Sequence, residues 1–481
     1  MMHSDFYLSL REATSFENLC DPQWLFRRRF PDFDPEKLNT AVRTALQRIC
    51  DQPERKSSLE DQVRPDGAEA IQSLHSILEK LDQSGLLIRS VHFNDQCLAS
   101  LIPQSQYFVF EAKQISPSKK YCLSRFAYLH AEQNELILES PLSLARVVLA
   151  QSITAAILQR LTHPTTLQEL CSENSTLPES ILSDFVSLLF SCKMVCEVNT
   201  DGISAEEESV NLRSWEFHDF LYHTKSRAGR HDRPAGGTFR FAGIIETPPV
   251  LKPAMTGERI ELFRPDLNKL KKEDPPFAHV QEERCSIREY SKEPITDQQL
   301  GEFLYRVIRV SDFQKVTFPT RAGFLQIDSA LRPYPSGGAL YELELYVTIQ
   351  RCNNLPSGFY HYDPDQHALS RISPMTAETR ELLNQAAYSM GISADQLQTL
   401  ITISARFQRV AWKYATIAYS IILKNTGVLY QTMYLAATAM GLAPCGIGYG
   451  DSELFSRVAG TEYIAETSVG EFALGSRSKI Y

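Results

Sequence analysis

The stretch that decides the fold is Arg409–Asp451, RVAWKYATIAYSIILKNTGVLYQTMYLAATAMGLAPCGIGYGD. Within it, the apolar residues of Val410–Ser420 predict one mostly buried helix. Val428–Gly450 is the longest weakly charged run of the chain. Because this run is interrupted by Gly441 and Pro444, we expect a buried helix followed by a loop, and not a membrane span.

Two titratable residues, Lys413 and Tyr414, lie side by side in the first predicted helix. At about 100° per residue, Tyr414 falls on the apolar side, while Lys413 joins Thr416, Ser420 and Lys424 in one narrow polar stripe. A helix with so thin a stripe either skims the surface or lines a pocket. Taken alone, Lys413 is an edge lysine whose amine reaches solvent, and Tyr414 is a core tyrosine.

The rest of the C-terminal region alternates helix and strand patterns. Residues 295–310 (ITDQQLGEFLYRVIRV) predict a helix. YELELYVTIQ, residues 341–350, predicts a half-buried strand whose glutamates face outward. Residues 358–372 (GFYHYDPDQHALSRI) predict a hairpin, and residues 468–475 (SVGEFALG) a late strand. This mixture predicts an α+β domain.

The N-terminal part reads as smaller helical and strand units. Residues 71–93 predict a helix, a Ser-Gly stop and a strand, and YCLSRFAYLHAEQNELILES predicts a hairpin with its turn at 132–134. Residues 140–161 (SPLSLARVVLAQSITAAILQRL) read as helical, and residues 165–198 predict two more helices and a closing strand. This order predicts winged-helix-like domains. Since their helices lack basic clusters, peptide docking at a sheet edge fits better than DNA binding.

The composition is that of a globular protein, with 481 residues, 43% hydrophobic and 22% charged residues. A net charge of −9 without a concentrated basic face argues against a nucleic-acid partner. The N-terminus lacks the pattern of a secretory signal. The ten cysteines show no metal-ligand spacing, so we expect no metal site and a cytoplasmic location.

Four short segments could bind a ligand. RCSIREYS places Arg284 and Arg288 four residues apart, and on a helical turn both could clamp a phosphate; a solvated surface pair is the alternative. In RPYPSGGALYELELY, two adjacent glycines indicate a special backbone shape. GIGYGD, residues 446–451, offers a close backbone approach to a flat ligand, or a plain tight turn. ALGSRSK, residues 473–479, offers a second phosphate contact or a basic tail.

These segments, in this order, resemble the FMN-dependent azoline oxidases of the cyanobactin type, which belong to the nitroreductase superfamily. The resemblance covers about Pro253–Tyr481 and extends upstream through the junction SWEFHDFLYHTKSRAGRHDRPAGGTFRF. Residues 137–170 are similar to the precursor-peptide recognition fold of peptide-modifying enzymes. One departure is that Gly427 is followed by Val428, where many streptolysin-type relatives carry a histidine.

The resemblance implies a domain organisation and a set of site residues. We expect winged-helix-like domains at 1–115 and 116–203, the second peptide-recognition-like, an ordered linker at 204–255, and a nitroreductase-like FMN domain at 256–481. Lys413 and Tyr414 match the pair assigned to catalysis. The expected FMN contacts are Arg284, Ser286, Arg288, Pro335, Ser336, Gly337, Gly446, Gly448, Tyr449, Ser476 and Arg477.

The implied activity is the oxidation of thiazoline or oxazoline rings in a ribosomally made peptide, with O2 as final acceptor. The implied partners are the azoline peptide, its leader, and a second copy of the chain with FMN at the interface. Free Lys and Tyr have pKa values near 10, so one of the pair needs a lowered pKa to act as a base. Two alternatives are an NAD(P)H-dependent nitro or quinone reductase, and a non-catalytic scaffold that binds a precursor peptide.

Overall fold

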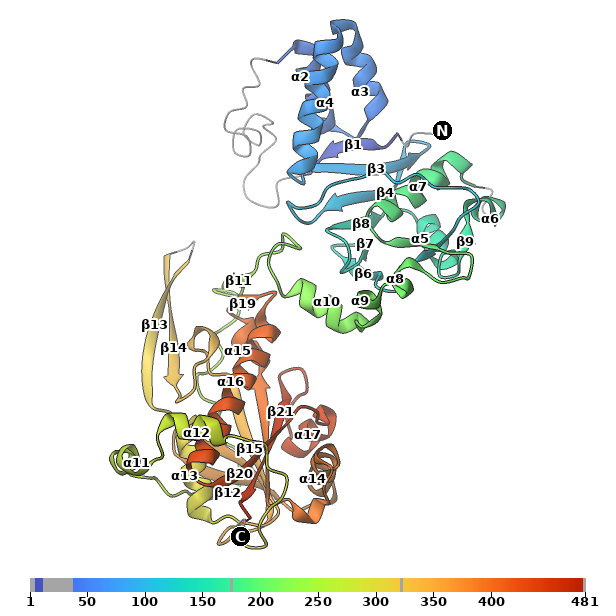
Figure 1. Ribbon diagram of the computed structural model, residues 1–481. Helices are drawn as coiled ribbons and strands as arrows, with labels where there is room; N and C mark the ends of the chain where they lie inside the picture. Colours follow the sequence, from blue (N-terminus) through green and yellow to red (C-terminus); the bar gives the residue numbers. More distant parts are fainter. Residues whose placement is uncertain (1–4, 12–37, 174–175, 321–322, 479–481) are drawn as a thin grey trace. The chain divides into compact units, whose positions relative to one another are not determined.

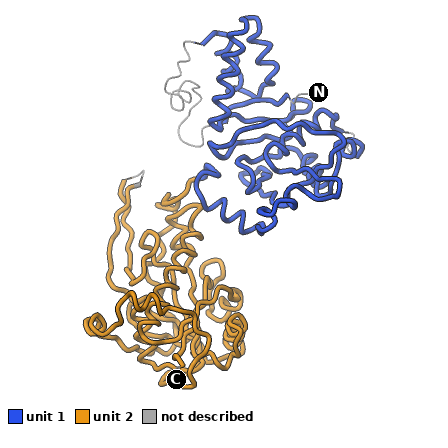
Figure 2. Tube along the Cα trace, in the orientation of Figure 1, with its two compact units in different colours: residues 1–233 blue, residues 234–481 orange. Residues whose placement is uncertain are grey.

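The chain folds into two compact units, residues 1–233 and 234–481 (Figure 2). The computed structural model describes residues 5–11, 38–173, 176–320 and 323–478. The boundary between the units falls inside the predicted linker 204–255, so the linker is shared between them. The predicted subdivision of the first 203 residues stays a prediction.

Unit 1 contains two sheets, of seven strands in the order β2-β1-β3-β4-β8-β7-β6 and of three strands in the order β10-β5-β9 (Figure 1). Its strands are β1 (Tyr7–Leu10), β2 (Glu54–Arg55), β3 (Leu87–Phe93), β4 (Gln96–Pro103), β5 (Lys120–Leu123), β6 (Tyr128–Glu132), β7 (Glu135–Glu139), β8 (Ala145–Leu149), β9 (Thr165–Thr166) and β10 (Val195–Val198). Its helices are α2 (Thr40–Asp51), α3 (Lys56–Val63), α4 (Ala68–Gln83), α5 (Ser152–Arg160), α6 (Leu167–Glu173), α7 (Glu179–Ser191), α8 (Ala205–Glu208), α9 (Val210–Arg213) and α10 (Phe217–Lys225).

Most expected elements of unit 1 are present. Helix α4 ends at Gln83 with Ser84 as its C-cap, Gly85 takes a φ of 66°, and strand β3 follows. The β6–β7 turn uses Gln133 and Asn134, both with positive φ, as a tight hairpin turn requires. One prediction is wrong: Ala145–Leu149 is a strand, not a helix, because it pairs with both β4 and β7. Its run of β-branched residues could have indicated this.

Unit 2 is built on a seven-stranded antiparallel sheet in the order β12-β17-β16-β15-β18-β21-β20. Its strands are β11 (Gly236–Gly237), β12 (Glu258–Glu261), β13 (Asp312–Thr320), β14 (Gly323–Leu331), β15 (Leu343–Ile349), β16 (Gly358–Asp363), β17 (Ala368–Pro374), β18 (Thr399–Arg406), β19 (Tyr414–Ala415), β20 (Leu442–Ile447) and β21 (Glu466–Ser476). Its helices are α11 (Leu267–Glu273), α12 (Phe277–Glu283), α13 (Asp297–Ile308), α14 (Ala377–Met390), α15 (Phe407–Ala411), α16 (Ala418–Ala439) and α17 (Ser452–Ala459), with a short 3₁₀ turn at Gly337–Ala339.

Helices cover both faces of this sheet. Residues of α13 and α16 form one core with β15, β18 and β21, and residues of α14 and α17 form another core on the opposite face. The central strand β15 is therefore buried along its whole length. The expectation that its glutamates face outward is wrong. Glu342 is fully buried, and Glu344 is buried in an ion pair with Arg406, whose Nε lies 2.9 Å away.

The expected helix Val410–Ser420 is also broken. Helix α15 ends at Ala411, Tyr414–Ala415 form the short strand β19, and α16 begins at Ala418 (Figure 1). The polar stripe that a continuous helix would carry therefore does not form. After α16 the chain enters strand β20, where we expected a loop. In the part of the chain that the structure describes, no helix combines the length and hydropathy needed to cross a membrane.

Candidate active site

The break beside Lys413 is caused by the segment that enters unit 2. Strand β11 pairs with β19, so that Gly237 lies opposite Tyr414 and Gly236 opposite Ala415. Thr416 takes a φ of 68°, which is a costly conformation for a β-branched residue. Its hydroxyl donates to the Pro234 carbonyl at 2.7 Å. Pairing with residues 234–237 thus overrides the local preference for helix.

The Lys413 side chain turns inward from this break. Its relative exposure is only 2%, and Nζ donates to the Gly338 carbonyl at 3.3 Å. Nζ also lies 3.5 Å from the ring centroid of Phe318. Burial lowers the pKa of Lys413 from its ordinary value to about 8. Tyr414 responds in the opposite way, since burial raises the pKa of its phenol.

The glycine pair of RPYPSGGAL lies directly against Lys413 and Tyr414. Gly338 takes a φ of 69°, which favours glycine. A Cβ at Gly338 would lie 2.4 Å from the Tyr414 hydroxyl and 2.6 Å from Lys413 Nζ. The structure therefore brings two of the sequence-predicted segments into contact. We call Ser336, Gly337, Gly338, Lys413 and Tyr414 the lysine site.

A buried amide holds the glycine loop to α16. Asn425 Oδ1 accepts from the Gly337 N–H at 3.0 Å, and its Nδ2 donates to Ser336 Oγ at 3.1 Å and to Glu342 Oε1 at 2.9 Å. Burial raises the pKa of Glu342, against the lowering effect of the hydrogen bonds from Asn425 and Ser336. Asn425 and Glu342 therefore act as positioning residues for the loop. Sequence reasoning missed both, although an asparagine inside an apolar helix was a signal.

A second group of predicted residues gathers around Tyr434 of α16. Ser286 Oγ and the Tyr434 hydroxyl lie 2.7 Å apart, and that hydroxyl accepts from the Gly446 N–H at 2.7 Å. The Arg284 guanidinium lies 5.3 Å from the Tyr434 ring centroid. Tyr434 itself was not singled out by the sequence.

RCSIREYS is extended, not helical, because α12 ends at Glu283 and the Ile287 N–H donates to the Pro444 carbonyl beside β20. Alternate residues of an extended segment point the same way. Arg284, Ser286 and Arg288 therefore still share one side, although the predicted helical turn is wrong.

The chain at the end of the last strand, β21, lies beside the RCSIREYS segment. Tyr290 and Arg477 form an isolated antiparallel bridge, and Arg477 is exposed. Ser476 is turned inward: its hydroxyl donates to the Glu293 carbonyl and accepts from Gln398 Nε2 at 2.9 Å. Ser476 thus positions the strand, while Arg477 has a guanidinium free to face solvent. We call Arg284, Ser286, Arg288, Gly446 and Arg477 the arginine site.

The GIGYG segment was expected to offer backbone N–H groups to a flat ligand, and only part of it is free to do so. Gly446 already donates its N–H to Tyr434, whereas Gly448 and Tyr449 are exposed, Tyr449 at 82%. Glu471 lies behind the segment, since a Cβ at Gly450 would lie 2.2 Å from Glu471 Oε1. Burial raises the pKa of Glu471 to about 7.

Within one chain, the two sites lie at different heights along α16. The lysine site is anchored at Asn425 and the arginine site at Tyr434. These residues are nine positions apart in one helix, which corresponds to about 14 Å along its axis. A ligand that touches both sites of the same chain must therefore be long, or the two sites belong to different ligand positions.

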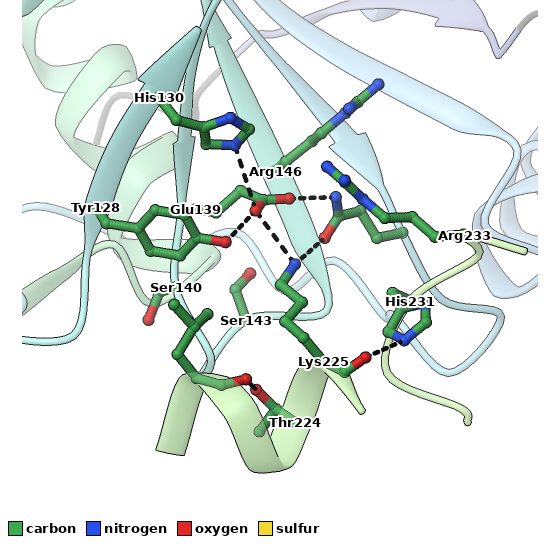
Figure 3. A network of polar contacts seen from close by, with 12 residues as sticks. Tyr128, His130, Glu139, Ser140, Ser143, Arg146, Thr224, Lys225, His231 and Arg233 are labelled. Atoms are coloured by element: carbon green, nitrogen blue, oxygen red, sulfur yellow. Dashed lines mark hydrogen bonds and ion pairs between the residues drawn. The ribbon is translucent and has the colours of Figure 1, made fainter. Parts of the chain in front are cut away.

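Unit 1 contains a separate polar network centred on Glu139 of β7 (Figure 3). The carboxylate accepts from the Tyr128 hydroxyl and from Gln104 Nε2, and it pairs with Lys225 Nζ of α10 at 3.2 Å. Burial alone would raise the pKa of Glu139, but Lys225 and the hydrogen bonds outweigh it and lower the pKa to about 2. The network therefore ties α10 to the sheet, and we assign it a structural role.

We expect Glu139→Gln to destabilise unit 1 by about 2–3 kcal/mol, less than the loss of a fully buried pair, because it leaves the half-buried Lys225 without its carboxylate. The pKa of Glu139 is lowered on folding, so its contribution is complete above an ordinary carboxyl pKa of 4.5 and is lost as the pH falls towards 2. Hydrogen exchange of residues 128–139 in the full chain measures this effect. Glu173→Gln, which breaks an exposed pair with Arg160, is the control and should cost less than about 1 kcal/mol. Equal exchange in both variants would contradict the assignment.

The sheet, its two helical layers and the grouped glycine and arginine segments define unit 2 as a domain with the nitroreductase-like fold. Comparison with known families agrees: residues 282–476 match the nitroreductase family. Residues 121–232 match the family described as cyanobactin oxidase ThcOx. The resemblance expected from the sequence is confirmed by these two matches.

Two curated relatives are similar to parts of the chain. MJ1384 of Methanocaldococcus jannaschii, a protein assigned to the nitroreductases, is 29% identical over 199 residues, which are 41% of this chain and 89% of that protein. The microcin B17-processing protein McbC of Escherichia coli is 31% identical over 129 residues, 26% of this chain and 47% of McbC. The chain thus spans about half the length of McbC.

Solved structures that are similar to part of this chain include a protein from Anabaena variabilis assigned to the nitroreductases. It is 21% identical, with a TM-score of 0.35, and the match covers 53% of this chain and 45% of that one. Another is a chain of the E. coli microcin synthetase McbBCD complex with truncated pro-MccB17 bound. It is 18% identical, with a TM-score of 0.34, and the match covers 50% of this chain and 82% of that one.

Proposed function

We propose that the protein is an FMN-dependent azoline oxidase, which dehydrogenates thiazoline or oxazoline rings of a ribosomally made peptide to thiazole or oxazole. The observation that carries the proposal is Lys413, a buried lysine with a lowered pKa held against a glycine loop. The matches to the cyanobactin oxidase and nitroreductase families support this choice of reaction class.

The residues present fit FMN. The arginine site offers two guanidiniums and a hydroxyl on one side of an extended segment, with Arg477 exposed beside them, and this donor set suits a phosphate. Beside the lysine site, the loop of Pro335, Ser336 and Gly337 leads into Gly338, whose missing side chain lets Lys413 and Tyr414 lie against the backbone, and this loop is the proposed contact of the flavin ring. When bound, FMN supplies the acceptor for the two electrons removed from the azoline, and dioxygen is the proposed final acceptor.

Lys413 is the proposed base. Aromatisation of an azoline removes one proton from a ring carbon together with one hydride. A lysine with a pKa of about 8 is partly neutral near pH 7, so its amine can take that proton. Tyr414 keeps its proton, because burial raises the pKa of the phenol. We assign Tyr414 the role of a hydrogen-bond donor that orients the ring or the amine.

We propose that the active protein is a homodimer with FMN between the subunits. The anchors of the lysine and arginine sites, Asn425 and Tyr434, lie about 14 Å apart along α16 and about half a turn apart around it, so one flavin is reached more easily by sites from two chains. Helix α16 also exposes the apolar side chains of Tyr419, Leu423 and Val428, which a second copy would cover. Each flavin would then contact the arginine site of one subunit and the lysine site of the other.

Subunit complementation tests this arrangement. Alone, Lys413→Ala and the double variant Arg284→Ala/Arg288→Ala should each be nearly inactive. When they are dissociated and mixed in equal amounts, half of the dimers are mixed, and each mixed dimer has one intact site. Activity should therefore return to about a quarter of the wild-type value. If no activity returns although mixed dimers form, the two sites serve one flavin within a single chain.

A visible absorption spectrum, taken before and after anaerobic addition of a thiazoline peptide, tests the proposed function. We expect a flavin spectrum that bleaches with the peptide, and a peptide that loses two hydrogen atoms per ring. Rapid bleaching by NADPH without peptide would favour a nitro or quinone reductase. A colourless protein that does not take up added FMN would favour a peptide-binding scaffold.

The N-terminal part has two further proposed properties. The region that matches the cyanobactin oxidase family is the proposed binding site for the leader of the substrate peptide. The proposed compartment is the cytoplasm, where thiols such as those of Cys122 and Cys196, whose sulfur atoms lie 3.4 Å apart, stay reduced.

A further inference from the structure

The hairpin β13–β14 is a part of unit 2 that the proposed mechanism does not use. Its two strands pair with each other over their full length and form a separate two-stranded sheet (Figure 1). Such a hairpin is only marginally stable unless one face packs against another element. Ile327 and Ala330 of β14 are buried, and the half-buried Phe318 of β13 adds to this packing, since its ring lies 5.4 Å from the ring of Phe239 and 3.5 Å from Lys413 Nζ.

Two rings from separate segments thus enclose the Lys413 amine. Phe318 comes from β13, and Phe239 comes from the segment after β11. The backbone N–H of Phe239 donates to the Lys413 carbonyl at 3.0 Å. The centroid of Phe239 lies 5.7 Å from Nζ. The backbone carbonyl of Gly338 is the hydrogen-bond acceptor for the amine.

No charged group balances this lysine in the part of the chain that the structure describes. Tyr414, with its ring centroid 5.2 Å from Nζ, is the titratable neighbour. The pKa of Lys413 is lowered by burial alone, without a contribution from an acidic or basic side chain. The side chains that exclude water therefore decide its protonation.

A phenyl ring has two opposed effects on an ammonium. Its face attracts the cation, which favours the protonated form. Its bulk excludes water, which favours the neutral form. Burial lowers the pKa of Lys413, and Phe318, whose ring centroid lies 3.5 Å from Nζ, is placed to exclude water from the amine.

We propose that Phe318 is a positioning residue of the active site, which together with Phe239 holds the Lys413 amine against Gly338 and keeps water away from it. Hairpin β13–β14 is then a wall of the site. This inference rests on the proposed function in one respect, which is the role of Lys413 as the base. The contacts of Phe318 do not depend on it.

Two substitutions separate the two effects of the ring. Phe318→Ala opens the site to water, so the protonation midpoint of Lys413 should rise by about one pH unit, towards that of a free lysine. Phe318→Leu keeps an apolar shield and removes only the attraction of the ring. Its midpoint should fall by about half a pH unit. Phe313→Ala is the matched control. Phe313 is exposed and lies five positions before Phe318 on the same strand, and because five is an odd number its side chain faces the other way.

The midpoint is measured on the full chain by competitive acetylation over a range of pH, followed by mass spectrometry of the peptide that contains Lys413. Opposite shifts in the two Phe318 variants, with no shift in Phe313→Ala, support the proposal. An unchanged midpoint in Phe318→Ala, or an equal shift in Phe313→Ala, overturns it. Acetylation needs no azoline oxidation, so wild-type protein that leaves a thiazoline peptide unchanged would contradict the proposed function and not the role of Phe318.

Discussion

Replacing Lys413 by alanine is expected to lower the rate of thiazoline oxidation by about 100-fold or more, the usual contribution of a well-placed general base. Lys413 is enclosed, has a pKa of about 8, and contacts the glycine loop through its amine. Its replacement removes no contact of the arginine site, so FMN should remain bound. Product is measured by the mass loss of the peptide, and FMN content by absorbance.

The pH dependence sharpens this test. Only the neutral amine can accept a proton, so the rate should rise with pH and level off above about 8. Below that pH, the rate should fall about tenfold per unit. The residual rate of Lys413→Ala should not show this rise with pH, which we call the pH step. Lys424→Ala is the control, since Lys424 is an exposed lysine on α16 and should keep both the rate and the step. A wild-type profile without the step, or full turnover by Lys413→Ala, would rule out Lys413 as the base.

Periodicity predicted the elements whose structure is decided locally. Helices α4, α7 and α13, the β16–β17 hairpin and strand β21 lie where the patterns placed them. The errors arose where a distant partner decides the conformation. Ala145–Leu149 is a strand because two other strands border it, and Glu344 is buried because Arg406 pairs with it.

The break beside Lys413 is the most consequential of these errors. Nothing in Val410–Ser420 ends a helix, since the sequence contains neither glycine nor proline there. The break depends on Gly236 and Gly237, which lie far upstream and pair with Tyr414 and Ala415. A reading of local propensity cannot find such a partner. The glycine pair, recognised only as part of a linker, was the available signal.

The order of short motifs predicted the candidate site residues, and the structure brings most of them together in two clusters. The order of motifs could not show which residues hold each cluster in place on helix α16. Asn425 of α16 is buried and Tyr434 is half-buried, so their polar groups need partners, and each of them bonds to a segment distant in sequence. Phe318 lies on a strand that carried no motif at all.

Replacing Gly338 by alanine is expected to lower azoline oxidation by about 10- to 100-fold while the protein stays folded. A Cβ at this position would lie 2.4 Å from the Tyr414 hydroxyl and 2.6 Å from Lys413 Nζ, so both side chains, or the loop itself, must move. A displacement of about 1 Å in a catalytic group can cost a factor of about 100 in rate. The loop is also held by Asn425, which limits how far the backbone can yield.

Alanine at Gly338 also adopts a left-handed backbone, which alone costs about 1 kcal/mol of stability. Gly391→Ala is therefore the matched control: Gly391 has a φ of 70°, against 69° at Gly338, and no heavy atom lies within 4 Å of its Cβ position. Gly391→Ala measures the backbone cost alone, Gly338→Ala should lose more stability on thermal unfolding because its Cβ also displaces side chains, and only Gly338→Ala should lose activity. Equal activities would mean that the glycine loop does not position Lys413 and Tyr414. A rate loss in Gly338→Ala with an unchanged pH step would show that the amine is displaced while its protonation is kept.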